Sequence, residues 1–571
     1  MRAILGINFF HDSSAALVVD GELKAAVEQE RLDRRKHSHG LPTDAINLCL
    51  NTAGIKGDQV TDVVCSWHPT LFALERLLSP FRRARNLKRI PWVFYQQCVG
   101  EMYRTKTRIN GYARLVIPNA RIHWIEHHLS HTCSTFLVSG FDEAATWSVD
   151  GRGEWSTSMA SHAVGNKVTP FKRTFWPNSI GYYYNMFTNY LGFGADDEYK
   201  VMGLSGYGSP IYKDEISPIL KYSQNDLFKF DTAYYKHEWL GDPLGDRVGN
   251  KVKDILGPQR QPDSPMEERH MDIAASVQSV LTDVGVKVAE RIQKTTGSKN
   301  LCLAGGVALN GVMNNAIRAS GLFDNIFIQP AAGDSGCALG NAFWCENIFY
   351  GNPRRFSLEH VYLGSSFDDE YIKLELEKCQ VMHKRLDDPA QTAAQFLTQG
   401  KIIGWYQGRS EFGPRALGNR SILADPRVAE AKEIVNSKIK FREEFRPFAP
   451  AVLADDAHDY FDLSGASKYM LMVCPVLPKK QSEIPSVTHI DGTARPQTVV
   501  REDNPMFWDL INNFKALTGT PVVLNTSFNV KDEPIVETPV DALRCFFSSG
   551  LDYLIMGSYL VSKAGIPADI A

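Results

Sequence analysis

The sequence has no long apolar run. Nowhere in its 571 residues do about 18 apolar side chains follow one another, which is the length that a membrane-spanning helix requires. The first residues, MRAILGINFFHDSS, contain a short apolar stretch, lack a small-residue cleavage pattern and soon reach His11 and Asp12. We therefore expect no membrane association, and we interpret this stretch as a buried strand and not as a signal peptide.

Cysteine motifs and an excess of basic residues are also absent. The ten cysteines form no C-x-x-C pair and share no repeated spacing, which argues against a disulfide scaffold or a zinc ribbon. The 62 Lys and Arg residues are balanced by 65 Asp and Glu residues, giving a net charge of −3, whereas nucleic-acid binding requires many phosphate-neutralising cations. We expect a cytoplasmic enzyme without a nucleic-acid partner.

Two similar strand patterns indicate an internal duplication. Near the N-terminus, Ala3–Ile7, Ala15–Val19 and Leu23–Val27 are strand-like runs, and an Asp-Gly turn typical of a hairpin joins the last two. Around residues 144–174 the chain repeats the pattern of strand, small polar loop, strand, Gly-Asn turn and strand. The sequence therefore predicts an α/β fold that contains two copies of one unit.

A change of pattern near residues 350–365 predicts a domain boundary. Before it, an amphipathic helix spans Met271–Ile292, with apolar residues at three- or four-residue steps. After it, a new α/β unit begins with a helix at Ala390–Leu397 and a strand at Ile402–Trp405. Further strands are expected at Ala449–Leu453, Leu471–Val476 and Pro521–Leu524. We predict two domains, residues 1–355 and 356–571.

Three histidines lie within five residues in IEHHLSHTCS. His127 and His131 are four apart, so on a helix they project from one face and can bind one metal ion, whereas His128 points away and is expected to be structural. Asp150 in SVDGRGEWS and Asp334 in PAAGDSGCALG follow strands and lie in Gly-rich loops. These four side chains form an N₂O₂ set suited to iron, manganese or zinc. A helix start with one structurally satisfied histidine is the alternative.

Glycine-rich loops mark places where the backbone can approach a phosphate. Gly151 and Gly153 follow a strand, and Gly305 and Gly306 precede a helix in LAGGVALNGVMNN. Lys200, in DDEYKVMGLSGYG, lies beside a Gly-rich turn and is a candidate phosphate contact. Tight strand–helix packing is the structural alternative for the Gly-Gly loop, and an isolated lysine is often only solvated.

Four separate segments of the second domain, each marked by Gly or Pro, carry an arginine. Guanidinium groups offer planar, forked donation to phosphate and carboxylate oxygens. Lys440 adds a cation, and Asn525 and Ser527 in LNTSFN are neutral groups that can hydrogen-bond an amide. We interpret Arg442 and Arg501 as solvated. The four candidate anion-binding arginines are Arg415, Arg420, Arg446 and Arg495.

The order of motifs resembles a known family. FHDSSAAL, RRKH, HHLSH, VDGRGE, SIGYYY, YKVMGL, LAGGVALN and GDSGCALG, followed by GWYQGRSEFGPRALGNRSILADP, FREEFRPFAP, GTARPQTV and PVVLNTSFNVKDEPIV, are similar to motifs of the O-carbamoyltransferases of natural-product biosynthesis. These are the nodulation-factor, cephamycin and aminoglycoside antibiotic carbamoyltransferases. The resemblance covers nearly the whole chain. It implies a duplicated actin/Hsp70-like first domain, similar to the tRNA threonylcarbamoyladenosine factor, and a second domain similar to threonylcarbamoyl-adenylate synthase.

The resemblance also implies a reaction. The second domain is expected to take carbamoyl phosphate and ATP, with Mg²⁺, and to form carbamoyl-adenylate, pyrophosphate and phosphate. The first domain is expected to hold the adenylate on a divalent metal, iron by analogy, with Ser179 and Asn310 added to the glycines and Lys200 as adenylate contacts. A hydroxyl of a small natural product then attacks the carbamoyl carbon. By resemblance, His11 is the base, Asp12 orients the acceptor, and Lys36 reaches the adenylate.

Several alternatives stay open. An actin-fold ATP phosphotransferase would not require the arginines, and an ATP-driven chaperone-type module would require neither the arginines nor the histidine pair. A tRNA-modifying carbamoyl-type transferase is kept open by the basic, aromatic-rich stretch at residues 79–97. The sequence carries no signature of the acceptor, and it leaves a homodimer open.

Overall fold

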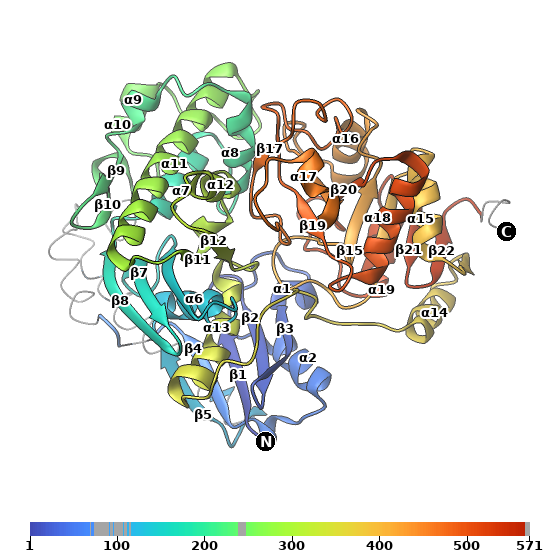
Figure 1. Ribbon diagram of the computed structural model, residues 1–571, viewed down its shortest axis with the longest axis horizontal. Coiled ribbons are helices and arrows are strands. Elements are labelled where there is room, and N and C mark those ends of the chain that lie inside the picture. The colour runs from blue at the N-terminus through green and yellow to red at the C-terminus, as the bar shows by residue number, and fades with distance from the viewer. Residues whose placement is uncertain are drawn as a thin grey trace. The chain divides into compact units, whose positions relative to one another are not determined.

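The computed structural model describes residues 1–68, 70–72, 91, 95, 107, 111–112, 116–237 and 247–565 (Figure 1). The chain forms two compact units. Unit 1 comprises Met1–Ala26 and His39–Leu358, and unit 2 comprises Val27–Ser38 and Glu359–Ala571. This division differs from one drawn at a single point of the sequence, because the short segment Val27–Ser38 packs with unit 2 although unit 1 residues flank it on both sides.

Unit 1 begins with a five-stranded sheet whose order is β3-β2-β1-β4-β5. β1 pairs antiparallel with β2 and parallel with β4, and β4 pairs parallel with β5. All six residues of β1 are buried, as expected for a strand covered on both faces. The strands are β1 (Ala3–Asn8), β2 (Ser14–Val19), β3 (Glu22–Glu28), β4 (Asp62–Ser66) and β5 (Arg121–Ile125).

A second sheet repeats this topology, with the order β12-β11-β6-β7-β8. Its first strand in the chain, β6, again pairs antiparallel with the next strand and parallel with a later one, β11, which pairs parallel with β12. This repeat confirms the predicted duplicated α/β fold. The strands are β6 (Glu143–Val149), β7 (Ser156–Val164), β8 (Lys167–Phe175), β11 (Asn300–Ala304) and β12 (Asn325–Ile328).

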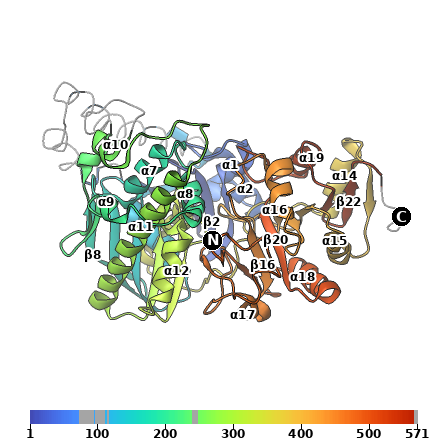
Figure 2. The same ribbon diagram turned by 90° about the horizontal axis from the view of Figure 1, so that it is seen from above.

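Helices connect the two sheets of unit 1. α13 (Cys337–Phe343) packs on β1, β2 and β4, and α6 (His127–Phe136) packs on β6, β7 and β11. α6 and α13 also pack against each other, so the two repeats meet along this helix pair. On unit 1 as well, α11 (Glu268–Thr296) lies beside α12 (Gly311–Ala319), as both views show (Figures 1 and 2).

Unit 2 is built on an eight-stranded mixed sheet with the order β13-β22-β21-β14-β15-β20-β16-β19. Side chains of β14 alternate between two cores: Trp405 faces α15 (Pro389–Thr398) and α18 (Pro505–Thr518), and Tyr406 faces α19 (Pro539–Phe547). The strands are β13 (His383–Arg385), β14 (Ile403–Tyr406), β15 (Arg420–Ala424), β16 (Ala449–Leu453), β19 (Gln497–Val499), β20 (Val522–Ser527), β21 (Tyr553–Met556) and β22 (Tyr559–Ser562).

Most predicted elements are present. α11 extends the predicted helix by a turn at its C-terminal end, whereas the strand expected at Leu471–Val476 is reduced to the two residues of β17 (Cys474–Pro475). The stretch 79–97 lies outside the described residues, apart from Pro91 and Tyr95. In the part of the chain that the structure describes, no helix combines the length and apolarity that crossing a bilayer requires.

Candidate functional site

The four predicted metal ligands of unit 1 come together. The Nε2 atoms of His127 and His131, one turn apart on α6, are 3.0 Å from each other. Asp150 Oδ2 lies 3.4 Å from the Nε2 of His127 and 3.1 Å from that of His131. Asp334 Oδ1 lies 3.4 and 3.5 Å from the same two atoms. Both rings are buried, and the four side chains converge on one point.

Strand ends and glycines set this geometry. Asp150 directly follows β6, and Asp334 lies three residues before α13, at the seam between the repeats. A Cβ on Gly305, whose φ is +94°, would lie 2.1 Å from a backbone oxygen of Val149, and one on Gly153 would lie 3.0 Å from the ring of His127. These positions therefore need glycine for close approach.

Glu154 is a further residue of this site that sequence reasoning missed. Its fully buried carboxylate accepts the backbone N–H of His127 at 3.0 Å and that of His68 at 2.6 Å. Because His127 is the first residue of α6, Glu154 fixes where the helix begins and hence where both rings point. A glutamate directly after a Gly-Arg-Gly loop carries no local signal of this contact.

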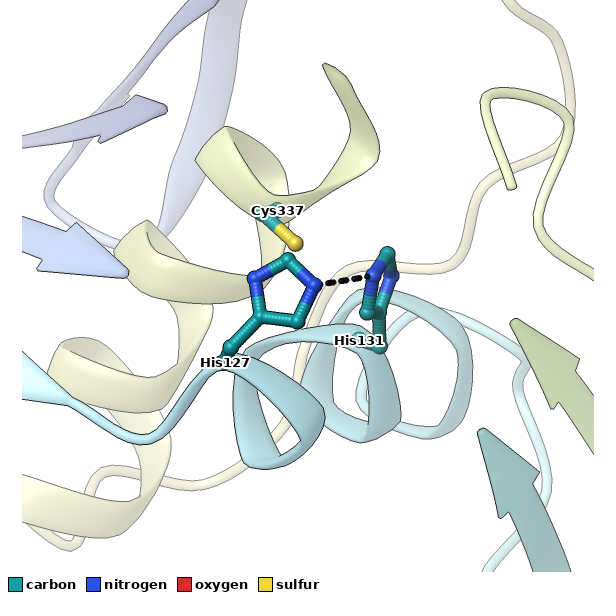
Figure 3. Close-up of side chains that lie close together, drawn as sticks. All are labelled: His127, His131 and Cys337. Carbon is teal, nitrogen blue, oxygen red and sulfur yellow. Dashed lines mark hydrogen bonds between the residues drawn. The ribbon is translucent and has the colours of Figure 1, made fainter. Parts of the chain in front are cut away.

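The arrangement fits a metal ion. Ligand atoms about 2.1 Å from a tetrahedral metal lie roughly 3.4 Å from one another. The distances of 3.0–3.5 Å between the Nε2 and carboxylate oxygen atoms are close to this value. Cys337, the first residue of α13, forms a second candidate ligand group with the two histidines, and Figure 3 shows its sulfur beside the rings. Sequence reasoning missed this thiol.

The charges of the cluster support the same conclusion. Burial raises the pKa of Asp150, but hydrogen bonds and charge from His127 and His131 outweigh it and hold that pKa well below its ordinary range. Burial lowers the pKa of His128 well below the usual value, and its Nδ1 lies 3.0 Å from Ser148 Oγ. Burial lowers the pKa of His127 and His131, but neighbouring negative charge outweighs it and raises both well above the usual value. The cluster therefore combines ionised carboxylate with positively charged imidazole, and the position of His128 agrees with the predicted structural role.

His11 lies between two carboxylates of unit 1. Its Nδ1 is 3.0 Å from Asp12 Oδ2, and its Nε2 is 3.2 Å from Asp196 Oδ1. Burial lowers the pKa of His11, but Asp12 and Asp196 outweigh burial and raise it to about 12. The resting imidazole is therefore protonated. Asp196, which sequence reasoning missed, lies where a proton donor would have to approach.

Among the predicted adenylate contacts, Ser179 and Gly306 lie at the loops that border the metal cluster, and Lys200 pairs with a carboxylate. Ser179 caps α7 (Ile180–Tyr190), and its hydroxyl donates to Gly151 O at 2.7 Å, so it shapes the predicted phosphate loop. A Cβ on Gly306 would lie 3.1 Å from Asp150 Oδ1, so this glycine borders the metal cluster. Lys200 Nζ lies 3.1 Å from Asp197 Oδ2.

Asn310 does not support its predicted role. Its Oδ1 accepts the Met313 N–H at 2.9 Å and caps α12, and its Nδ2 donates to Gln278 Oε1 at 2.9 Å. Gln278 returns a hydrogen bond of 3.0 Å to Asn310 Oδ1. Because the amide is occupied within the fold, we correct this assignment from a ligand contact to a helix cap.

In unit 2, the sheet topology gathers the predicted anion-binding loops. β14 and β20 both run antiparallel to β15, β16 runs antiparallel to β20, and β19 runs parallel to β16. The carboxyl ends of β14 and β20 therefore share one edge with the amino ends of β16 and β19. The segments that carry the candidate cations adjoin these four strand ends.

The cations on this edge lie close enough to repel one another. Burial lowers the pKa of Arg495 well below its usual value, and the charges of Arg415, Arg442 and Arg446 lower it further. Burial also lowers the pKa of Lys440, assisted by Arg442 and Arg446. Arg442 thus belongs to the cationic group, which corrects its interpretation as solvated. A buried cluster of one sign is costly unless an anion joins it.

Lys440 lies beside the LNTSFN motif and donates hydrogen bonds to two of its residues. Lys440 Nζ donates to Asn529 Oδ1 at 2.6 Å and to Ser527 Oγ at 3.1 Å. Asn525 is buried, and its Nδ2 donates to Gln497 Oε1 at 3.0 Å. Asn529 was missed from the sequence, although it follows two candidates in the same motif.

Arg420 is a structural residue and must be removed from the predicted set. Its guanidinium is fully buried and donates to the carbonyls of Gln407 at 2.7 Å, Asn419 at 3.0 Å and Ser365 at 3.3 Å. It also stacks 3.7 Å from the centre of the Tyr406 ring. Arg420 therefore stabilises the fold, because its N–H groups donate to backbone carbonyls and its planar face covers an aromatic ring.

The predicted catalytic residues are divided between the units. His11 and Asp12 belong to unit 1, whereas Lys36 belongs to the segment Val27–Ser38 of unit 2. Lys36 is exposed, and its charge contributes to lowering the pKa of Lys440. Its side chain therefore joins the cationic group of unit 2.

Comparison with known proteins identifies the class. The family model described as carbamoyltransferase N-terminus matches residues 3–343, and the carbamoyltransferase C-terminus matches residues 394–563. The chain belongs to the carbamoyltransferase family and is a carbamoyltransferase.

Its relatives extend over both units. An uncharacterized protein of Synechocystis is 40% identical, covering 99% of this chain and 98% of its own length. Nodulation protein NolNO of Sinorhizobium fredii is 39% identical, covering 97% of this chain and 79% of its own length. Among solved structures, HypF of T. kodakarensis is 13% identical with a TM-score of 0.33, covering 61% of this chain and 48% of HypF.

Proposed function

We propose that this carbamoyltransferase is an ATP-dependent O-carbamoyltransferase. It uses carbamoyl phosphate as donor and a hydroxyl of a small natural product as acceptor. The observation that carries the proposal is the cationic group of unit 2, in which the partly buried Arg495 lies within the charge of Arg415, Arg442 and Arg446. Phosphate-bearing substrates supply the charge that this group needs.

Unit 2 activates the carbamoyl group. Its arginines bind the phosphate of carbamoyl phosphate and the phosphates of ATP. Water releases phosphate from carbamoyl phosphate, and an oxygen of the resulting carbamate attacks the α-phosphorus of ATP, which expels pyrophosphate. Lys440, Ser527 and Asn525 supply hydrogen bonds for the small carbamate group, and Lys36 offsets charge on the adenylate. The products are carbamoyl-adenylate, pyrophosphate and phosphate.

Unit 1 transfers the group. His127, His131, Asp150 and Asp334 would hold a divalent metal, and iron, zinc and manganese all accept such ligands. When bound, the metal supplies positive charge for the adenylate phosphate. The backbone of Gly151, Gly153, Gly305 and Gly306 approaches the adenylate without steric hindrance, and Lys200 adds a cation. The acceptor oxygen attacks the carbamoyl carbon, the bond to the AMP phosphate oxygen breaks, and AMP leaves.

His11 takes the proton of the acceptor hydroxyl under one condition. With both ring nitrogens facing carboxylates, the imidazole has no lone pair to offer. The acceptor must therefore replace Asp196 at Nε2, while Asp12 keeps its hydrogen bond to Nδ1. The resulting Asp12–His11–hydroxyl arrangement follows the logic of other acid–base triads.

The proposed setting is a reducing compartment. The nine described cysteines are free, and eight of them are buried. This usage is typical of cytoplasmic proteins.

The first test is the acceptor-independent partial reaction. Purified protein is given ATP, Mg²⁺ and carbamoyl phosphate, each omitted in turn, and AMP, ADP and pyrophosphate are measured. Pyrophosphate that depends on carbamoyl phosphate supports the proposal, together with carbamoyl-adenylate or the AMP that its hydrolysis by water releases. ADP, or nucleotide turnover that ignores carbamoyl phosphate, contradicts it and favours a phosphotransferase.

A further inference from the structure

The segment Val27–Ser38 reaches unit 2 from between two elements of the N-terminal part of the chain. It starts at the end of β3 and contains α1 (Gln29–Asp33), and the chain returns to unit 1 at His39, before α2 (Thr43–Ala53). Because the segment is short and its helix has only five residues, it has no hydrophobic core of its own. Its place in unit 2 depends on a few side-chain contacts.

Two of its side chains bind the backbone of one residue, Gly413, through the two successive peptide groups that flank it. Glu28 Oε1 accepts the N–H of Gly413 at 2.5 Å, and Arg31 Nη2 donates to the carbonyl of the same residue at 2.5 Å. Both side chains are buried, with Glu28 5% and Arg31 1% exposed. Gly413 has φ +121°, and it stands two residues before Arg415 in the loop between β14 and β15.

Arg34 makes a comparable contact to a second loop. Its guanidinium donates to Ile535 O at 2.6 Å and to Pro534 O at 2.8 Å. The same loop contains Asn529, whose Nδ2 donates to Glu533 O at 2.7 Å and whose Oδ1 accepts from Lys440. The segment therefore contacts two of the loops that carry the proposed substrate-binding groups.

Stability alone does not explain the Glu28–Arg31 pair. The closest approach of the two charged groups is 3.9 Å, between Arg31 Nε and Glu28 Oε2, and neither atom has a hydrogen-bond partner among the described residues. Burial raises the pKa of Glu28 to about 7 against the charge of Arg31. An apolar pair would often be at least as stable in such a place. What this pair specifically provides is a fixed orientation of the two peptide groups that flank Gly413.

We propose that Glu28 and Arg31 are positioning residues that fix the Arg415 loop of unit 2, so that the substrate site is completed by a segment from the N-terminal part of the sequence. A loop with glycine at 413 and 418 has a flexible backbone. Contacts to both the N–H and the carbonyl of Gly413 restrict that freedom and direct the Arg415 side chain before substrate binds. This inference rests on the function proposed for unit 2.

The test uses the full-length protein and two readouts. Glu28→Ala removes the acceptor of the Gly413 N–H, Glu28→Gln keeps an amide oxygen in its place, and Arg31→Met removes the donor. Arg35→Ala, on an exposed residue of the same segment, is the control. We measure KM for carbamoyl phosphate in AMP formation, and amide hydrogen exchange over residues 411–418.

We expect Glu28→Ala and Arg31→Met to raise KM by about tenfold or more, with a smaller change in kcat and faster exchange over residues 411–418. Glu28→Gln and Arg35→Ala should stay within about threefold of the wild type. Unchanged exchange and KM in Glu28→Ala and Arg31→Met would overturn the proposal. So would a loss that Glu28→Gln shares and that accompanies unfolding of all of unit 2. If the wild type forms no AMP, the proposed function fails, and the exchange measurement alone still decides whether the segment fixes this loop.

Discussion

The candidate sites of the two units differ in the charges that they bring together. In unit 1, two aspartates and two histidines face one point, and their charges compensate one another within hydrogen-bonding distance. In unit 2, arginines and a lysine lie close together, and burial and the charges of Arg442 and Arg446 lower the pKa of Arg495 and of Lys440. The first arrangement accepts a cation and the second requires an anion. Under the proposed function, unit 1 would hold a metal and unit 2 would hold phosphates.

The largest effect is expected from removing the central cation of unit 2. Arg495→Met should reduce AMP formation by about 10²–10³-fold, because a buried charged donor to a phosphate is lost. The same change should raise the melting temperature of the substrate-free protein, since an uncompensated buried charge is removed. Kinetics and thermal unfolding check both outcomes, with exposed Arg501→Ala as control. Lower activity together with lower stability would mean that Arg495 holds the fold.

The next prediction concerns the candidate metal site of unit 1. His131→Ala should abolish stoichiometric metal binding and reduce carbamoyl transfer by more than about 10²-fold, because even partners of ligands contribute tenfold or more. Pyrophosphate formation without acceptor should stay near the wild-type rate, since that reaction belongs to unit 2. His162→Ala, whose ring is partly exposed and pairs with Glu143, is the matched control. Equal loss of both reactions would show that the sites do not act separately.

Local patterns in the sequence predict the parts of these sites that depend on chain neighbours. His127 and His131 share a helix face, and Gly153 and Gly305 follow strand ends, so short-range geometry suffices. The function of Arg420 depends on carbonyls that loops place around it, and a guanidinium in a Gly-rich motif looks the same whether it binds phosphate or backbone. The contact of Arg31 with Gly413 joins residues 382 apart, and no local pattern encodes it.

The third prediction concerns His11, a histidine of unit 1 that lies between two carboxylates. Asp196→Asn should lower the pKa of His11 from about 12 toward the ordinary value, because one of its two carboxylate partners loses its charge. A histidine with a raised pKa stabilises the fold fully below the unfolded pKa and loses this contribution as pH rises through the folded value. NMR titration between pH 6 and 9 should show a titrating His11 only in the variant. A wild-type His11 ring that titrates near pH 6.5 would contradict the inference that Asp12 and Asp196 keep it protonated.

The smallest expected effect is a shift in melting temperature on ligand binding, and it distinguishes the two sites most directly. A ligand at 100 times its Kd stabilises the folded state by about 2.7 kcal/mol, which corresponds to a few degrees in melting temperature. Pyrophosphate should therefore stabilise the wild type and His131→Ala but not Arg495→Met, because only the last lacks the central cation of unit 2. A divalent metal should stabilise the wild type and Arg495→Met but not His131→Ala. Crossed losses of this kind follow only if the anion and the cation bind at separate sites. If either substitution removed both shifts, the opposite charges of the two units would serve one shared site.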